Sequence, residues 1–166
     1  GSHALQNSTA SSLVAVGHYA LNDNTSGVEN VAVGANALDV NTTGDKNTAL
    51  GNGSLGSNTT ADNNTGLGYL ALTSNTTGTS NVALGSRAGQ DNTTGEITAL
   101  GTSALTDNTT GLGNTAVGYQ SLYKNTTGNA NTAVGNNYHG IIGAAMYANT
   151  TGRKNCAFGP EALYAN

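Results

Sequence analysis

Residues 114–128 read NTAVGYQSLYKNTTG, and nearly all of the remaining chain repeats variations of this stretch. The glycine at its fifth place recurs every 17 residues, apart from one interval of 16 and a last interval of 24. These glycines are Gly17, Gly34, Gly51, Gly68, Gly85, Gly101, Gly118, Gly135 and Gly159. A fixed period of this length is typical of a solenoid in which each repeat forms one coil.

Each repeat divides into strand-forming and turn-forming parts. Its first four residues, such as NVAV at 30–33, place β-branched residues at a period of two, which favours a short strand. The glycine that follows ends this strand because it adopts positive φ without steric cost. We expect a second short strand at the next Ala-Leu or Ser-Leu pair, and a turn at Asn-Thr-Thr-Gly in which the glycine reverses the chain. Helices are excluded because glycine and Asn-Thr-Thr recur too often.

The predicted fold is all-β, a parallel β-roll (β-solenoid) of about nine coils of 17 residues. Residues 4–166 form one repeat array, with an inserted loop at 136–144. Residues 1–3 read GSH and are expected to be a remnant of a cleaved tag.

Composition argues against several classes of function. Only 8% of residues are charged, and the net charge of −4 is spread over single residues, so there is no basic stripe for nucleic acid. No apolar stretch is long enough for membrane insertion. No Ser-His-Asp set, paired carboxylates or phosphate loop recurs at constant spacing, so we expect neither enzymatic activity nor a cofactor. His18 and His139 are far apart and predict no metal site.

The strand alternates small and bulky positions. Its third residue is never larger than alanine, whereas the second and fourth are apolar or threonine. This pattern indicates burial on both faces, with a partner chain covering one of them. Either the alanine ladder or the fourth-place ladder, which could also form core, packs against neighbouring copies. The fourth-place ladder comprises Val16, Val33, Leu50, Leu67, Leu84, Leu100, Val117, Val134 and Phe158.

Three further expectations concern single residue types. Cys156 stands where other repeats carry valine or threonine, and is expected to be a small buried apolar residue. The Asn-Thr-Thr sequences are formally glycosylation sites, but coils stacked about 4.8 Å apart leave no room for a glycan on every rung, which favours a structural asparagine ladder. Charged residues beside the turns, including Glu29, Lys46 and Lys154, are expected on the outside of the coil.

Units such as NVALG at 81–85 and NTAVG at 114–118 resemble the Asn-Ser-x-Ala-Ile-Gly repeats of the YadA-like head of trimeric autotransporter adhesins. They are equally similar to repeats of bacteriophage tail fibres. The resemblance implies a left-handed β-roll assembled as a homotrimer and exposed on a bacterial surface or a phage virion. It also implies a non-enzymatic, structural or adhesive fibre segment that attaches to a cell-surface glycan or protein receptor. The chain departs from the family pattern in its longer coil and in Thr or Val where Ser usually follows the asparagine.

One repeat is interrupted between Gly135 and Ala145 by seven additional residues. The excess includes Tyr138, His139, Ile141 and Ile142, which are candidate ligand-binding residues for a receptor or glycan. Alternatively, the two isoleucines pack against a neighbouring chain or coil.

The alternative function is a binding module for ice or glycan along a repeated face. Ice binding would require threonines spaced along a flat strand, whereas Thr42 and Thr43 and their equivalents are adjacent and lie beside turn-forming residues.

Overall fold

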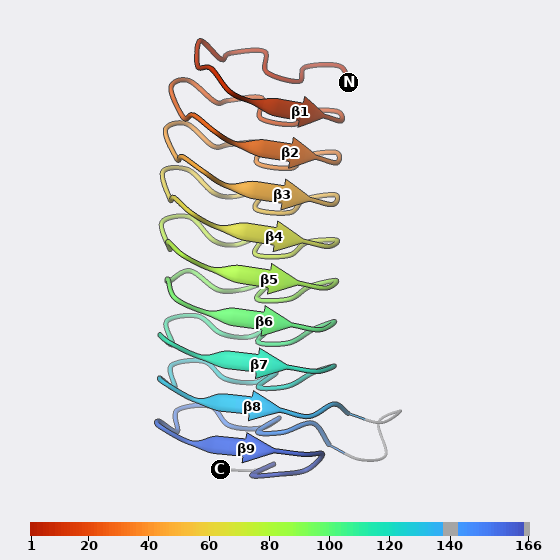
Figure 1. The fold of residues 1–166 in the computed structure, drawn as a ribbon, viewed down its shortest axis with the longest axis vertical. Helices are drawn as coiled ribbons and strands as arrows, with labels where there is room; N and C mark the ends of the chain where they lie inside the picture. Colours follow the sequence, from red (N-terminus) through yellow and green to blue (C-terminus); the bar gives the residue numbers. More distant parts are fainter. Residues whose placement is uncertain (138–142, 165–166) are drawn as a thin grey trace.

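The structure, a computed structural model, describes residues 1–137 and 143–164. These residues contain nine three-residue strands and no helix. All strands are parallel and form one sheet in chain order (Figure 1). The strands are β1 (Val14–Val16), β2 (Val31–Val33), β3 (Thr48–Leu50), β4 (Thr65–Leu67), β5 (Val82–Leu84), β6 (Thr98–Leu100), β7 (Thr115–Val117), β8 (Thr132–Val134) and β9 (Cys156–Phe158).

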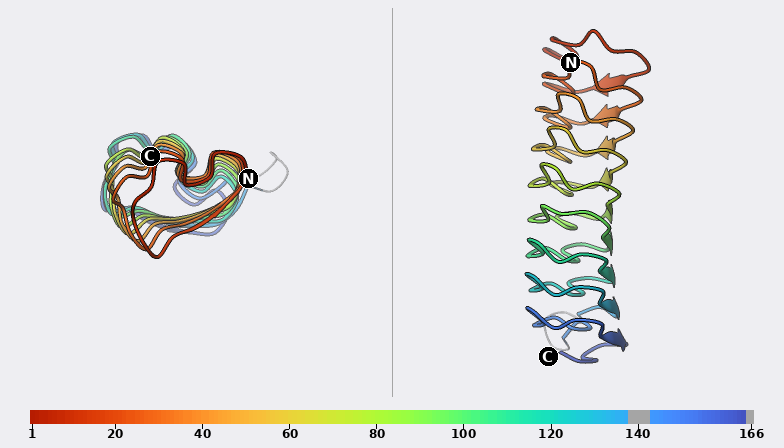
Figure 2. Two further views of the ribbon diagram at one scale, coloured as in Figure 1. Left: turned by 90° about the horizontal axis from the view of Figure 1, so that it is seen from above. Right: turned by 90° about the vertical axis from the view of Figure 1, so that its left-hand side faces the viewer.

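The register of the sheet joins equivalent places of successive repeats. Ala32 pairs with Ala49, and Ala133 pairs with Ala157 across the 24-residue repeat. The 16-residue repeat between β5 and β6 keeps the same register, so changes in length are absorbed outside the strands. Figures 1 and 2 show the coils stacked along one axis, with the sheet on one side. The predicted all-β parallel solenoid is confirmed.

The prediction of a second strand in each coil is wrong. The returning segment is a turn whose leucine has a left-handed backbone, as in Leu38 (φ 50°), Leu55 (φ 51°) and Leu122 (φ 50°). This conformation costs a non-glycine residue about 1–2 kcal/mol. Burial of the leucine side chain contributes about 1.5–3 kcal/mol, enough to offset that cost. The turn also satisfies its backbone, because the amide of Leu38 donates to Ser54 O in the next coil at 3.1 Å.

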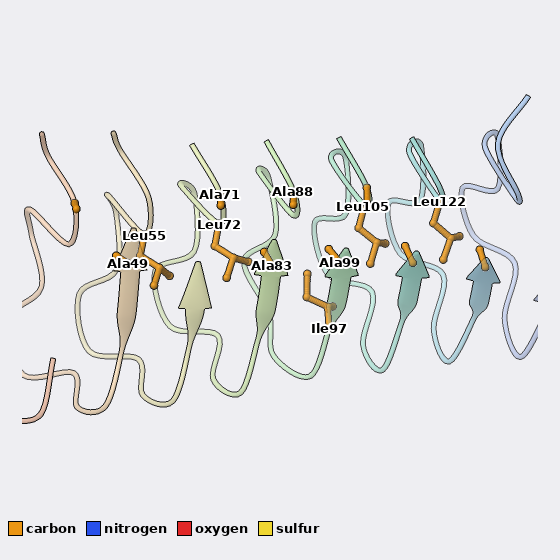
Figure 3. Close-up of a cluster of buried hydrophobic side chains, with 14 of the residues drawn as sticks. Ala49, Leu55, Ala71, Leu72, Ala83, Ala88, Ile97, Ala99, Leu105 and Leu122 are labelled. Carbon is orange, nitrogen blue, oxygen red and sulfur yellow. The ribbon is translucent and has the colours of Figure 1, made fainter. Parts of the chain in front are cut away.

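The core is a thin column between the sheet and the returning segment. Alanines from the strand centres meet the leucines of the turns, as Figure 3 shows for Ala49 with Leu55 and for Ala83 with Leu72. The size limit at the strand centre follows from this contact: a β-carbon on Gly66 would lie 2.6 Å from Ser54 Oγ and 3.4 Å from Leu55 Cγ. The alanine ladder therefore faces inward, and the alternative in which it packs against neighbouring copies is wrong.

Asparagines form a second, polar column inside the coil. Asn41 of the Asn-Thr-Thr-Gly turn is fully buried, and its Nδ2 donates to Gly44 O at 3.0 Å and to Asn24 Oδ1 at 2.8 Å. Asn30, at the first place of its repeat, donates from Nδ2 to Gly44 O at 2.7 Å. The structural asparagine ladder is thus confirmed.

The glycine of the repeated turn, which reads Asn-Thr-Ser-Gly at residues 24–27, acts differently from the expectation. Gly27 does not have positive φ, so it does not reverse the chain through that conformation. A β-carbon on Gly27 would instead lie 2.7 Å from Asn24 Oδ1. Close approach to the asparagine ladder and to the next coil is therefore what requires glycine here.

Candidate assembly face

The second and fourth places of each repeat are the first and last residues of its three-residue strand. Their side chains point away from the core and form what we call the outer face. Val16, Leu84 and Phe158 of the fourth-place ladder are 56%, 49% and 68% exposed. The ladder lies outside the core cluster along its whole length. The second-place residues of the outer face are Val14, Val31, Thr48, Thr65, Val82, Thr98, Thr115, Thr132 and Cys156.

The outer face is uncovered in the single chain, which is unusual for a face of a parallel sheet. None of its residues in the nine described strands is charged, and all are aliphatic or aromatic, threonine or cysteine. At about 4.8 Å per strand, the face extends over roughly 40 Å. Parallel sheets are normally covered on both faces, and contiguous exposed apolar patches mark interaction sites. The face therefore has the chemistry of a surface that packs against another.

Cys156 lies on this face and not in the core. The expectation of a buried cysteine is wrong, because Cys156 is exposed at the second place of β9. Its neighbour Ala157 takes the inward position instead. Alternation along the strand fixes this outcome, since residues on either side of an inward side chain point outward.

Aromatic and charged residues border the outer face. Tyr69 and Tyr119 come two residues after β4 and β7 and are 49% and 42% exposed. Glu29, Lys46 and Lys154 come two residues before their strands and are exposed, as expected from the sequence. An apolar centre with an aromatic and charged rim is the anatomy of a protein interface.

A tyrosine stack, which the sequence analysis missed, stands on the returning segment of the last coils. Tyr147 stacks on Tyr123 with ring centroids 5.3 Å apart and on Tyr164 with centroids 5.5 Å apart. Lys124 Nζ lies 5.8 Å from the centroid of the Tyr123 ring. The signal was available, because the three tyrosines occupy the same place in consecutive repeats. Such stacking contributes about 0.5–1.5 kcal/mol per pair beyond burial.

The pKa values of three titratable groups on the returning segment are raised by their surroundings. Burial raises the pKa of Asp39, and Asp23 raises it further while His18 lowers it. Burial also raises the pKa of Asp107, which Lys124 lowers and Asp91 raises. Burial, with neighbouring tyrosines and Asp107, raises the pKa of Tyr147.

The threonines of the Asn-Thr-Thr turns form a ladder on a corner of the coil. Thr42 Oγ1 donates to Thr59 O at 3.0 Å, and Thr109 Oγ1 donates to Thr126 O at 3.0 Å. The second threonine of these turns, such as Thr43, is exposed, except for Thr94, which is half-buried. The hydroxyls of the first threonines, such as Thr42, are therefore held by hydrogen bonds to the next coil. They lie at the turns and not along the strands.

The predicted ligand-binding residues Tyr138, His139, Ile141 and Ile142 lie outside the described residues. The chain follows the repeat up to Asn137, whose amide donates to Tyr119 O at 3.0 Å. Ala145 lies in the stack, because its carbonyl accepts from the Leu122 amide at 3.1 Å.

Within residues 1–137 and 143–164, no group of three or more His, Cys, Asp or Glu side chains is placed to hold a metal ion. The same part of the chain has no helix with the length and hydropathy required to cross a membrane. Comparison with protein-family models, curated proteins and solved structures gave no match.

Proposed function

We propose that this chain is a non-enzymatic structural and adhesive segment of a homotrimeric fibre, on the outside of a bacterial cell or on a phage virion. The observation that carries the proposal is the outer face, an uncharged and largely apolar surface that runs the length of the solenoid. Packing of this face against two further copies would cover it. The number three comes from the resemblance to trimeric adhesin heads and tail fibres.

The energetics favour this assembly. Complete burial of a valine or leucine contributes about 1.5–3 kcal/mol, and the outer residues are already half covered by their neighbours. Each rung of the fourth-place ladder would therefore add about 1 kcal/mol, or on the order of 10 kcal/mol per chain. Association costs about 4–15 kcal/mol, and the second-place ladder and the tyrosines of the rim add further area.

The surfaces that remain exposed after assembly would bind the ligand. The turns carry most charged side chains, and the tyrosine stack of Tyr123, Tyr147 and Tyr164 lies on the returning segment. Both are outside the outer face. The proposed ligand is a glycan or protein receptor on a cell surface, and the long regular stack serves as a stiff spacer.

Thiol cross-linking tests which face assembles. Cys156 is exposed on the outer face, so a short bismaleimide should join Cys156 residues of two copies into a covalent dimer on denaturing gels. A matched variant carries Cys156→Ser with Thr127→Cys, which moves the thiol to an exposed turn. This variant should give at least tenfold less dimer. Equal cross-linking by both proteins would contradict assembly through the outer face.

One observation favours a second candidate, a repeated-face module for ice or glycan. Hydrogen bonds to the next coil hold the hydroxyls of Thr42, Thr59 and Thr109, so the ladder presents a rigid periodic array. Ice-recrystallisation and glycan-array assays would test it with Thr42→Lys and Thr59→Lys, which remove two members of this array. This candidate fails if the parent chain is inactive in both assays.

A further inference from the structure

Eleven Asn-x-Ser/Thr sequences occur in the chain, and the fold treats them differently. Eight belong to the repeated turns, and their asparagines are fully buried: Asn24, Asn41, Asn58, Asn75, Asn92, Asn108, Asn125 and Asn149. The other three begin at Asn7, Asn52 and Asn63, which are exposed.

The eight buried asparagines donate hydrogen bonds from Nδ2, which is the atom to which an N-linked sugar is attached. Asn58 Nδ2 donates to Asn41 Oδ1 at 2.9 Å and to Ala61 O at 3.1 Å. Asn125 Nδ2 donates to Asn108 Oδ1 at 2.7 Å and to Gly128 O at 3.0 Å. Nδ2 of each repeated asparagine donates two such bonds, except at Asn92, where the structure gives one, to Thr94 O at 2.6 Å.

Attachment of a sugar conflicts with both of these contacts. When glucose is transferred from UDP-glucose, the bond between its anomeric carbon and Nδ2 forms and the bond to the UDP oxygen breaks. UDP leaves, and Nδ2 loses one proton. The amide then keeps one hydrogen for two acceptors, and the sugar ring needs space where the asparagine has no exposed surface.

We propose that N-linked glycosylation at the repeated sites and closure of the coils exclude each other. The eight repeated asparagines accept a sugar only before their coil closes, and a sugar on any of them prevents that coil from closing. The folded chain takes a sugar at Asn7, because Asn7 and Thr9 are exposed. Each makes a single side-chain hydrogen bond at the surface, from Asn7 Nδ2 to Asp23 Oδ1 at 3.2 Å and from Thr9 Oγ1 to Thr25 O at 3.1 Å. This inference is independent of the proposed fibre function. It sets an order of events during synthesis: the coils must close before any glycosyltransferase of this specificity reaches them.

Asn52 provides a matched comparison for Asn7. Its side chain is exposed, but Ser54 of the same sequence is buried and donates from Oγ to Gly66 O at 2.8 Å. A transferase that must contact this hydroxyl cannot reach it in the folded chain. Asn63 is set aside because Thr65 of its sequence is half-buried within strand β4.

The test uses the full chain made by cell-free translation, with a purified N-glycosyltransferase and UDP-glucose. The enzyme is present from the start or added after folding, and peptide mass spectrometry measures occupancy at each site. Added late, it should modify Asn7 with at least tenfold higher occupancy than Asn52 or any repeated asparagine. Present early, it should modify repeated asparagines, and those molecules should be the ones that protease digests.

The variant Thr43→Val serves as the control. It removes the sequence at Asn41 by changing an exposed side chain and leaves the buried amide in place, so it should carry no sugar at Asn41. Sugar on repeated asparagines in protease-resistant molecules would overturn the proposal. So would an early reaction that modifies Asn7 and leaves every repeated asparagine free.

Discussion

The Cδ1 atom of Ile97 lies 3.0 Å from the position that a β-carbon on residue 89 would occupy. Gly89 stands where other repeats place a core leucine, and its own backbone has φ of 56°. Ile97 stands where other repeats place a buried asparagine, and it is buried among the core residues (Figure 3). The isoleucine therefore fills the volume that the missing leucine leaves empty.

A double-mutant cycle tests this replacement. Gly89→Leu alone should destabilise the fold by about 1–3 kcal/mol because the leucine meets Ile97 and Leu72. Ile97→Asn alone should cost about 2–4 kcal/mol because it opens a cavity. Together they restore the usual pair, so the double variant should be at least about 1.5 kcal/mol more stable than the sum predicts. Additive free energies from urea unfolding would show that the two sites are independent.

The buried asparagine ladder predicts a strong response to an isosteric change. Asn58→Asp keeps the shape but replaces a donor of two hydrogen bonds by a charged acceptor facing Asn41 Oδ1 and Ala61 O. Stability should fall by about 3–5 kcal/mol at neutral pH. Asn36→Asp is the control, because Asn36 is exposed and aspartate tolerates its left-handed backbone (φ 56°). Thermal unfolding of both variants measures the difference, and similar losses would contradict a stabilising ladder.

Asp39 predicts a dependence of stability on pH. Burial raises its pKa, with Asp23 adding to the rise and His18 opposing it, so the ionised carboxylate is disfavoured in the folded chain. This cost is present in full above the folded pKa and disappears as the pH falls below the ordinary pKa of aspartate. Asp39→Asn should therefore be more stable than the parent at pH 7, and the advantage should vanish near pH 3.

A charge-matched control separates this effect from net charge. Asp45→Asn removes the same charge from another position. There the Asp45 side chain makes a local contact, because its Oδ1 accepts from the Val28 amide at 2.8 Å. An asparagine can keep this contact, as Asn129 does for the Leu112 amide. If denaturant unfolding gives both variants the same pH profile relative to the parent, burial of Asp39 is not the cause.

The outer face predicts a charge-sensitive assembly. Leu84→Lys introduces a cation at the centre of the face, where a neighbouring copy would have to desolvate it, so association should weaken at least a hundredfold. Thr77→Lys places the same charge on an exposed turn and should leave association unchanged. Light scattering over a dilution series compares the variants, and circular dichroism checks that both remain folded. Equal association constants would exclude the outer face as the contact.

The periodicity of the sequence was sufficient to predict the coil, the parallel sheet and a structural asparagine ladder, because each is repeated in register. It was insufficient for the returning segment, since a leucine with positive φ such as Leu38 is unfavourable by local preference and is stabilised by the core that it enters. The facing of the strand depended on that segment. Once the leucine supplies the core, Ala49 has to face it, and Leu50 and Cys156 turn outward.

The candidate site was predictable as a set of residues but not as a surface. The sequence showed that the ladder of Val33, Leu50 and its equivalents is apolar, yet both of its roles, core or contact, fitted that pattern. Only the geometry of the coil assigns it to the outside. The tyrosine stack depends on the same alignment of equivalent places across an interrupted repeat.

Sedimentation equilibrium of the unmodified chain at micromolar concentration tests the central claim most directly. One chain has a mass of 16.5 kDa. The proposed fibre segment predicts a single species of three times that mass, unchanged on tenfold dilution. A fully folded species of 16.5 kDa, with the outer face open to solvent, would contradict it.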